Sequence, residues 1–186
     1  MSLTTHSLTY DDLAGMPDDG NRYEIIGGVL CVSPSPTEVH QAISFRLTLL
    51  VGNFVTAERL GKVYAAPFDV RLSEQDVVQP DLIFVSQSRL SIIGPTCIEG
   101  APDLLVEILS PSTRDRDRIR KARLYAMSGV PEYWLVDPEA RTVTVLALHR
   151  GAYAQRDPRG DMIRSEILPG LEIDQRALFA GIMEHG

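Results

Sequence analysis

Hydrophobic residues recur every three to four positions over residues 37–60, and this spacing predicts one long helix. Thr37 suits the N-cap of that helix, because its hydroxyl can accept a backbone N–H of the first turn. A second helix is expected over residues 112–127, where Gly129 and Pro131 then stop it. The residues that show the helical spacing in the first helix are Val39, Ile43, Leu47, Leu50, Phe54 and Val55.

Short runs of apolar and β-branched residues, separated by turn residues, predict the strands. Gly27-Gly28 is a suitable two-residue turn between the first two of them. The run over residues 103–109 is almost entirely apolar, which indicates a strand buried on both faces. The expected strands are residues 23–26, 29–32, 62–66, 68–72, 77–85, 103–109, 132–136, 142–149 and a short strand at Tyr153.

The predicted elements follow the order hairpin, helix, a series of three strands, the buried strand over residues 103–109, helix, strand and terminal hairpin, with a short last helix over residues 174–183. Helices and strands that alternate in this way are typical of an α/β protein. No internal repeat, low-complexity tract or long linker divides the chain. We therefore expect one α/β domain over residues 1–186.

The composition limits the class of protein. With 44% hydrophobic residues the chain can bury one core, and its net charge of −7 argues against coating nucleic acid through the overall field. Cys31 and Cys97 are too few for a disulfide framework or a cysteine zinc site. No apolar run approaches the roughly 20 residues that a membrane span requires. A cytoplasmic protein with reduced thiols and no membrane partner is expected.

Two carboxylates occur where the pattern predicts buried strands. Asp81 follows Pro80 inside the strand expected over residues 77–85, and Glu107 lies inside the apolar run of the next strand. A buried carboxylate is costly unless it is paired or binds a metal. Either acid alone could instead accept backbone N–H groups or pair with an arginine. The presence of two such acids favours a metal site.

Strands that follow each other in sequence usually lie side by side, so Asp81 and Glu107 are expected to converge on one divalent cation. Their carboxylates should then lie within about 6 Å of each other. Mg²⁺ suits this ligand set best, because it takes one or two protein carboxylates and fills its other positions with water and phosphate oxygens. Mn²⁺ could replace it.

The second predicted helix carries a local excess of basic residues. Between Arg114 and Arg123 there are six bases and two acids, a charge of +4 in a chain of −7. Arg114 and Arg118 could bind DNA phosphates, or the segment could be a solvated helix with Arg–Asp pairs. Lys121 is notable because 16 of the 18 basic residues are arginine. An ammonium can hold or polarise a water nucleophile, whereas a guanidinium is a poor proton donor or acceptor.

As a set, several motifs resemble the Uma-two family of endonucleases, which belongs to the PD-(D/E)XK, or restriction-endonuclease-like, superfamily. The motifs are Arg22-Tyr-Glu-Ile-Ile-Gly-Gly28, Ser33-Pro-Ser-Pro36 with His40, Gln79-Pro-Asp-Leu82, Val106-Glu-Ile-Leu-Ser-Pro-Ser-Thr113, Lys121 with Tyr125, and Gly129-Val-Pro-Glu-Tyr-Trp-Leu-Val-Asp137. They extend over about residues 10–175. The resemblance implies a restriction-endonuclease-like fold, with a core of helix, three strands, helix and strand within about residues 22–175.

The resemblance also implies that Asp81 and Glu107 bind Mg²⁺. The superfamily places its lysine two positions after the second acid, where this chain has Leu109. Lys121 from the following helix is then expected to take that place and to orient or activate the attacking water. Its replacement by alanine is expected to remove cleavage while folding and Mg²⁺ binding stay nearly intact.

His40 and Glu24 are supporting candidates for the site. His40 stands near the start of the first long helix, where the superfamily often has a further acid, but it could be a helix histidine bonded to a neighbouring loop. Glu24 lies near the beginning of a strand and could belong to the site, or could pair with Arg22 or another arginine.

These features together predict a Mg²⁺-dependent endonuclease that hydrolyses phosphodiester bonds in DNA. A module of the same fold that binds nucleic acid or protein without catalysis, as a homodimer, is the alternative. A third reading is a structural or regulatory homodimer, which predicts neither metal nor polyanion binding. The trio of Asp81, Glu107 and Lys121 favours the enzyme.

Overall fold

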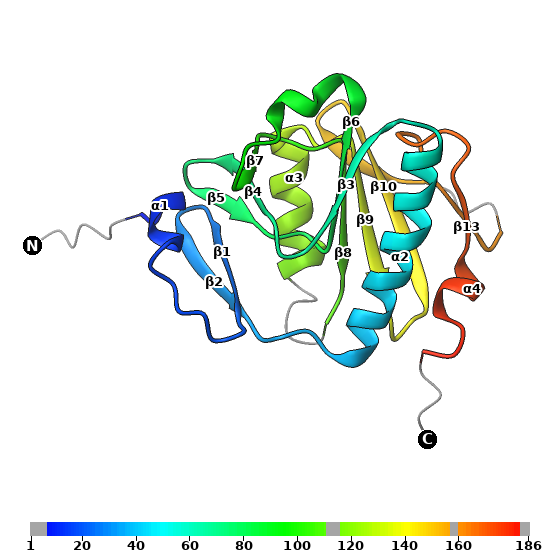
Figure 1. Cartoon of the computed structure of the whole chain (residues 1–186), viewed down its shortest axis with the longest axis horizontal. Coiled ribbons are helices and arrows are strands. Elements are labelled where there is room, and N and C mark those ends of the chain that lie inside the picture. Colours follow the sequence, from blue (N-terminus) through cyan, green and yellow to red (C-terminus); the bar gives the residue numbers. More distant parts are fainter. Residues whose placement is uncertain (1–6, 111–115, 157–159, 183–186) are drawn as a thin grey trace, which may run out of the picture.

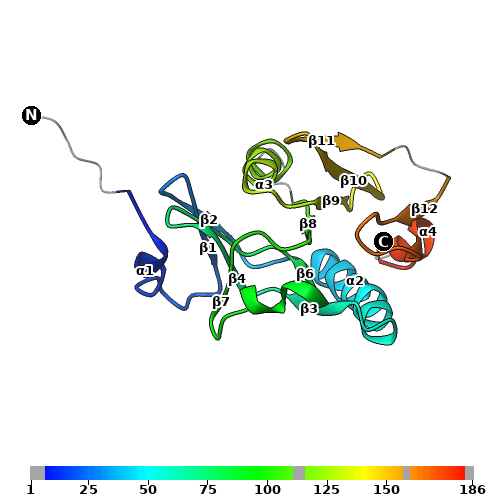
Figure 2. The same cartoon turned by 90° about the horizontal axis from the view of Figure 1, so that it is seen from above.

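The computed structural model describes residues 7–110, 116–156 and 160–182, and all of their side chains except those of residues 116–118. Within these ranges, a six-stranded central sheet has a helix on each face, and a five-stranded sheet lies beside it (Figures 1 and 2). Two short strands near the C-terminus form a separate pair. The arrangement agrees with the predicted α/β class.

The chain begins with a short helix and a hairpin. Helix α1 spans Tyr10–Leu13, and strands β1 (Arg22–Ile26) and β2 (Val29–Ser33) pair antiparallel. Gly27 and Gly28 between them have φ of 59° and 71°, and a type I′ turn requires positive φ at both central residues. The hairpin predicted from Gly27-Gly28 is confirmed.

Helix α2 (Glu38–Ala57) is the first long helix predicted from the hydrophobic spacing. The side chain of Thr37 caps it by accepting the backbone N–H of His40. Its buried residues are His40, Ile43, Leu47, Val51 and Val55. The buried row follows every fourth residue from Ile43, so Val51 is buried while Leu50 is exposed.

The central sheet has the strand order β11-β10-β9-β8-β6-β3. Its neighbouring strands are antiparallel, except that β8 and β9 are parallel. The strands are β3 (Gly61–Ala65), β6 (Leu82–Ser86), β8 (Leu104–Ile108), β9 (Glu132–Asp137), β10 (Thr142–His149) and β11 (Ala152–Gln155). Helix α2 covers one face and helix α3 (Ala122–Ser128) the other (Figure 2).

A helical connection joins the parallel strands β8 and β9, as a crossover of this kind requires. Its described part is the π-helical segment η2 (Arg116–Lys121) followed by α3, which ends at Gly129 with φ of 82°. The expected helix start at Ser112 lies outside the described residues. The order α2, β3, β6, β8, α3, β9 is the predicted core of helix, three strands, helix and strand.

The prediction of one strand over residues 77–85 is wrong, because the chain changes sheets within it. Strand β5 (Asp76–Val78) belongs to the second sheet, whose order is β2-β1-β5-β4-β7, while β6 belongs to the central sheet. Pro80 lies between the two strands and has no N–H to donate to either ladder. Asp81 therefore lies in the bend directly before β6.

Residues 86–102 contain more structure than the loose stretch that we expected. They hold the 3₁₀ helix η1 (Gln87–Ile92) and strand β7 (Cys97–Glu99). Strand β7 pairs parallel with β4 (Asp69–Ser73) at one edge of the second sheet. A strand of three residues is too short to produce a periodic hydrophobic signal.

The C-terminal part contains a pair of short strands and a helix. Strands β12 (Met162–Arg164) and β13 (Glu172–Asp174) are antiparallel, and α4 (Gln175–Phe179) follows them. The Asp174 side chain caps α4, so the last helix begins where we expected. None of the helices that the structure describes is long and apolar enough to cross a membrane.

Candidate active site

The central sheet places Asp81 and Glu107 on neighbouring chain segments. Leu82 of β6 pairs with Val106 of β8, so Asp81 and Glu107 are the next opposed positions in the same register. The backbone N–H of Asp81 donates to the carbonyl of Val106 at 3.0 Å, which continues the ladder. Leu82 and Val106 pack on the α2 side, so the acids face the opposite side of the sheet. Directly opposed residues have Cβ atoms about 5 Å apart, close enough to share one ion.

Asp81 is 2% exposed and has three close partners. Arg22 Nη2 donates to its Oδ1 at 2.9 Å, and the Ile108 backbone N–H donates to its Oδ2 at 2.7 Å. His40 Nε2 lies 3.2 Å from the same Oδ2. Burial works to raise the pKa of Asp81, but the His40 hydrogen bond, the Arg22 charge and the Ile108 N–H together lower it. Asp81 is thus an ionised acid at neutral pH.

His40 lies in the first turn of α2, at the end of the helix that is closest to Asp81. The cap formed by Thr37 fixes this turn, and the His40 residue is 9% exposed. Its Nε2 faces Asp81, while its Nδ1 is buried and has no hydrogen-bond partner in the described part of the chain. The structure therefore brings His40 to the candidate acid rather than to a loop.

Lys121 connects two further acids that come from different sheets. Its Nζ lies 2.8 Å from Glu107 Oε1 and 2.7 Å from Glu24 Oε1, and its side chain is only 1% exposed. Tyr125, four residues later on α3, donates its hydroxyl to the same Glu107 Oε1 at 2.7 Å. Burial and the Glu107 charge raise the pKa of Tyr125, so the phenol remains a donor. This side of the sheet is therefore covered by α3.

Glu24 enters the cluster from β1 of the second sheet. Arg22 and Glu24 are two residues apart on this strand, so their side chains point to the same side. Gln79, in the segment between β5 and β6, contacts both Arg22 and Glu24. Its backbone N–H donates to Glu24 Oε1 at 2.9 Å, and its carbonyl accepts from Arg22 Nη1 at 3.1 Å. Glu24 pairs with Lys121, and Arg22 pairs with Asp81.

The described side chains of the cluster carry an excess of negative charge. Three carboxylates, those of Asp81, Glu107 and Glu24, face two basic groups, those of Arg22 and Lys121. Burial disfavours the charged guanidinium of Arg22, but the three carboxylates outweigh burial and raise its pKa. A divalent cation is the kind of group that such an excess stabilises.

The donor set fits Mg²⁺ in its chemistry. Carboxylates are hard oxygen ligands, and Mg²⁺ needs only one or two of them from a protein. Cys31 lies near Arg120 and Cys97 near Glu99, so neither thiol belongs to the cluster. Among the described residues, no three or more His, Cys, Asp or Glu side chains are grouped to hold a metal ion. An ion on Asp81 and Glu107 would therefore need water or phosphate oxygens to complete its shell.

The family model with the printed description "Uma2: Putative restriction endonuclease" matches residues 9–176. The chain belongs to the Uma2 family. This match confirms the family that the resemblance of the sequence motifs implied. A search of the curated proteins finds no match.

A solved structure supports the fold of this Uma2 family member. Its description is "putative nuclease belonging to DUF820", from Anabaena variabilis ATCC 29413, and it superimposes with a TM-score of 0.78. The two sequences are 21% identical, and the alignment covers 95% of this chain and 99% of the other. At this identity the likeness shows the fold, which is consistent with the restriction-endonuclease-like core.

The predicted DNA contacts cannot be placed in this Uma2 structure. Arg114 lies outside the described residues, and so does the side chain of Arg118. From the same basic segment, Arg120 is described, and its Nη2 donates to the carbonyl of Ile26 at 2.9 Å. Arg120 thus ties the helical connection to the end of β1, and the roles of Arg114 and Arg118 stay predictions.

Arg22 and Tyr125 contact the candidate acids directly, and sequence reasoning assigned neither a role in the site. Two signals could have found them. Arg22 directly precedes the strand predicted over residues 23–26 and stands two residues before Glu24, so an extended chain would place both side chains on one face. Tyr125 stands four residues after Lys121, so the two share a side of a helix.

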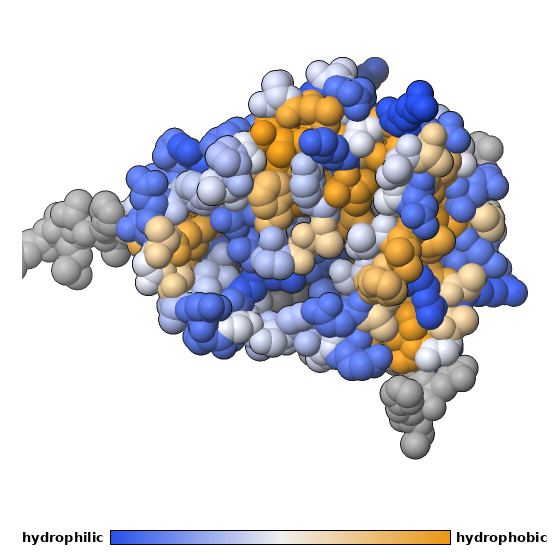
Figure 3. All heavy atoms as spheres, in the orientation of Figure 1, coloured by the Kyte–Doolittle hydropathy of each residue, from blue (hydrophilic) through white to orange (hydrophobic). Residues whose placement is uncertain are grey.

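The cluster lies at elements that surround a hollow on one face of the molecule. Figure 3 shows this hollow rimmed by hydrophilic side chains, between the β1–β2 hairpin and the start of α2 in the orientation of Figure 1. Arg22 begins β1, His40 lies in the first turn of α2, and Glu107 is near the end of β8. We expect a substrate to approach from this face.

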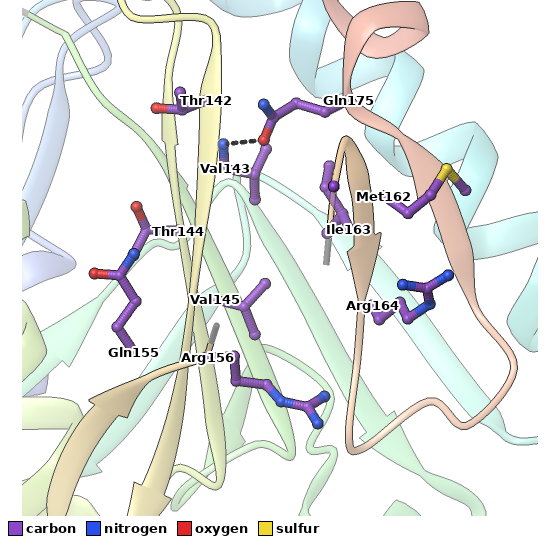
Figure 4. Close-up of a pocket in the computed structure, with 11 residues that line it drawn as sticks. Thr142, Val143, Thr144, Val145, Gln155, Arg156, Met162, Ile163, Arg164 and Gln175 are labelled. Carbon is purple, nitrogen blue, oxygen red and sulfur yellow. Dashed lines mark hydrogen bonds between the residues drawn. The ribbon is translucent and has the colours of Figure 1, made fainter. Parts of the chain in front are cut away.

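A separate cavity of about 520 Å³ lies between β10 and β12 (Figure 4). Val143 and Val145 point from β10 toward Ile163, while Thr142 and Thr144 point the other way. The residues that line it are apolar or polar side chains from β10, β11, β12 and the start of α4, and none of them is a predicted site residue. This cavity is therefore not part of the candidate active site.

Acid is expected to destabilise the protein through Asp81. The pKa of Asp81 in the fold is below its usual 3.8, so the ionised carboxylate contributes stability above that pH. This contribution is lost as the pH falls through the folded-state value. Urea unfolding of wild type and Asp81→Asn at neutral pH and stepwise below about pH 4 should show the difference between them shrinking. A difference that does not change with pH would contradict the prediction.

Proposed function

We propose that this chain is a metal-dependent endonuclease that hydrolyses phosphodiester bonds in DNA. The observation that carries the proposal is the opposition of Asp81 and Glu107 on adjacent segments, with Lys121 returning from the crossover helix to Glu107. The family description names a restriction endonuclease, which supports a nucleic-acid substrate. The excess of negative charge in the described cluster supports a requirement for a cation.

In this proposal each residue of the cluster has a distinct task. Asp81 and Glu107 hold Mg²⁺, which when bound would lower the pKa of a water molecule and stabilise negative charge on the phosphorus oxygens. His40 orients Asp81 and favours its charged form through the Nε2 contact. Lys121 fixes Glu107 and Glu24 and orients the attacking water, which an ammonium can do as a hydrogen-bond donor. Tyr125 limits the rotation of Glu107.

A nuclease assay tests the proposed function. The purified protein is incubated with single-stranded, duplex and branched DNA in the presence of Mg²⁺, Mn²⁺ or EDTA. We expect cleavage that requires the metal and that falls about 100-fold or more in the double variant Asp81→Asn/Glu107→Gln. Glu58→Gln, an exposed acid at the end of α2, is the control and should cleave like wild type. Metal-dependent cleavage that survives in the double variant would contradict the assignment.

A catalytically silent nucleic-acid- or protein-binding homodimer of the same fold is the second candidate. The close pairing of the cluster favours it, because Arg22 already neutralises Asp81, and Lys121 is buried between two acids. Such ion pairs can serve the structure alone. Calorimetric titration with MgCl₂ separates the two candidates: the endonuclease binds Mg²⁺ in a way that Asp81→Asn weakens, and the silent module binds none. Sedimentation of the same protein reports whether it is a dimer.

A further inference from the structure

Arg22 is the member of the active-site cluster that solvent reaches most easily. Its side chain is 20% exposed, whereas the side chains of Asp81 and Lys121 are 2% and 1% exposed. His40, at 11%, is intermediate. This ranking covers the side chains that the structure describes, which exclude those of residues 111–118. Within them, an anion that enters from solvent meets Arg22 before it meets the buried ammonium of Lys121.

The guanidinium of Arg22 is held in a fixed orientation and retains further donors. Nη1 donates to the Gln79 carbonyl at 3.1 Å, and Nη2 donates to Asp81 Oδ1 at 2.9 Å. A guanidinium carries five N–H groups, and these two contacts engage two of them among the described residues. Because a backbone carbonyl and a buried acid fix the plane of the group, the directions of its other donors are fixed as well.

A phosphate that enters the site must approach several carboxylates. Among the described side chains, those of Asp81, Glu107 and Glu24 lie around the basic groups of Arg22 and Lys121, and the acids would repel a phosphate diester unless a cation contacts it. Lys121 contacts both Glu107 and Glu24 and is only 1% exposed. Among the described basic side chains of the cluster, Arg22 combines partial exposure with direct contact to a candidate metal ligand.

We propose that Arg22 binds the phosphate of the nucleic acid that undergoes cleavage, with its guanidinium bridging Asp81 and a non-bridging phosphate oxygen. This inference rests on the proposed function, since it names the residue that contacts the substrate in the same site. Arginine suits this task because its planar group forms paired hydrogen bonds with phosphate oxygens while it keeps its charge. The second sheet thus supplies the substrate contact, and the central sheet supplies the acids.

The salt dependence of DNA binding tests this contact without catalysis. Wild type and variants are titrated with a short DNA duplex in EDTA over a series of KCl concentrations. Each phosphate contact contributes about 0.9 to the slope of log K against log salt concentration. Arg22→Gln is therefore expected to weaken binding and to reduce the slope by about 0.9. Arg22→Lys keeps the charge and is expected to keep the slope, with weaker binding because the paired geometry is lost.

Arg89 offers a matched control at the other end of β6. Its Nη1 donates to Asp103 Oδ1 at 3.0 Å and its Nη2 to the Ala101 carbonyl at 2.7 Å, so it contacts an acid and a backbone carbonyl as Arg22 does. Asp103 accepts the N–H of Ser86, where β6 ends, whereas Asp81 precedes the start of β6. Arg89→Gln removes the same charge and the same kinds of contact. Its salt slope should equal that of wild type.

A pair of variants tests whether Arg22 contacts the substrate or only supports Asp81. Asp81→Asn keeps Arg22 without its acid, and Asp81→Asn/Arg22→Gln removes both charges, so no buried acid is left unpaired. The double variant therefore covers the case in which Arg22→Gln alone does not fold. We expect the double variant to bind DNA more weakly than Asp81→Asn, with a slope lower by about 0.9. Equal binding of the two would overturn the proposal, because Arg22 would then act only on Asp81.

The remaining outcomes distinguish this inference from the proposed function. A wild-type protein that binds no duplex at low salt and cleaves none with Mg²⁺ would overturn both. A wild-type protein that binds and cleaves, while Arg22→Gln and the double variant keep the wild-type slope, would overturn the role of Arg22 alone. A slope that falls equally in Arg89→Gln would also overturn it, since the effect would then reflect overall charge.

Discussion

Replacing Lys121 by alanine is expected to lower the free energy of unfolding by about 3–5 kcal/mol. The ammonium is 1% exposed and lies 2.7 and 2.8 Å from the carboxylates of Glu24 and Glu107, which are themselves almost fully buried. Without Lys121, both acids lose a shared cation and repel each other in a region of low dielectric constant. This burial replaces the expectation from the sequence that Lys121→Ala leaves folding nearly intact. Urea unfolding followed by circular dichroism measures the change.

The chain contains its own control for this prediction, because its other lysine, Lys62, is exposed on β3. Lys62→Ala should stay within about 0.5 kcal/mol of wild type. Lys121→Met combined with Glu24→Gln and Glu107→Gln removes all three charges and is expected to recover much of the stability, without activity. If Lys121→Ala proved as stable as Lys62→Ala, the ion pairs of Lys121 would not be a source of stability.

The second large effect on the free energy of unfolding is expected at Glu132, which is not a candidate active-site residue. Glu132 is fully buried on β9, where its Oε1 accepts Trp134 Nε1 at 2.8 Å and Ser165 Oγ at 2.6 Å. Its Oε2 accepts the backbone N–H of Glu166 at 2.7 Å. Glu132→Ala leaves these donors without their acceptor and is expected to lower the free energy of unfolding by about 3 kcal/mol. Urea unfolding again provides the measurement.

Hydrogen exchange locates this second effect. Because Glu132 joins β9 to the segment that precedes β13, the amides of Glu166 and Leu168 should lose protection more than those of α2. Glu132→Gln keeps one acceptor oxygen and is expected to lose less stability than Glu132→Ala. Glu58→Ala, which replaces an exposed acid, should change neither the amide protection nor the free energy of unfolding by much. Uniform loss of protection across the chain would contradict a local role for Glu132.

Most elements could be predicted from the sequence because their causes are local. The spacing of apolar residues and the cap at Thr37 predict α2, and Gly27-Gly28 predicts the first hairpin. Both signals involve residues within a few positions of one another, so no distant contact is needed to explain them. The same holds for the end of α3 at Gly129, where the backbone adopts positive φ.

The errors occur where partners distant in sequence decide the structure. Residues 77–85 are mostly apolar and β-branched and were predicted as one strand, but β5 pairs with β1 and β4 while β6 pairs with β3 and β8. The local pattern contains no information on which sheet accepts each half. Hydrophobicity alone likewise does not say which side of α2 meets the central sheet, where Val51 is buried and its neighbour Leu50 is exposed.

By itself, the sequence determined which residues of this protein could carry chemistry. Asp81 and Glu107 are acids among apolar residues, Lys121 is one of two lysines, and the motifs resemble the Uma2 family, to which the chain belongs. Only the tertiary structure decided that Arg22 meets Asp81, and that Lys121 lies between Glu24 and Glu107. These pairs are 59, 97 and 14 residues apart in the chain. They meet because two sheets join at the segment before β6, and a buried charge is stable only where such pairing supplies its partner.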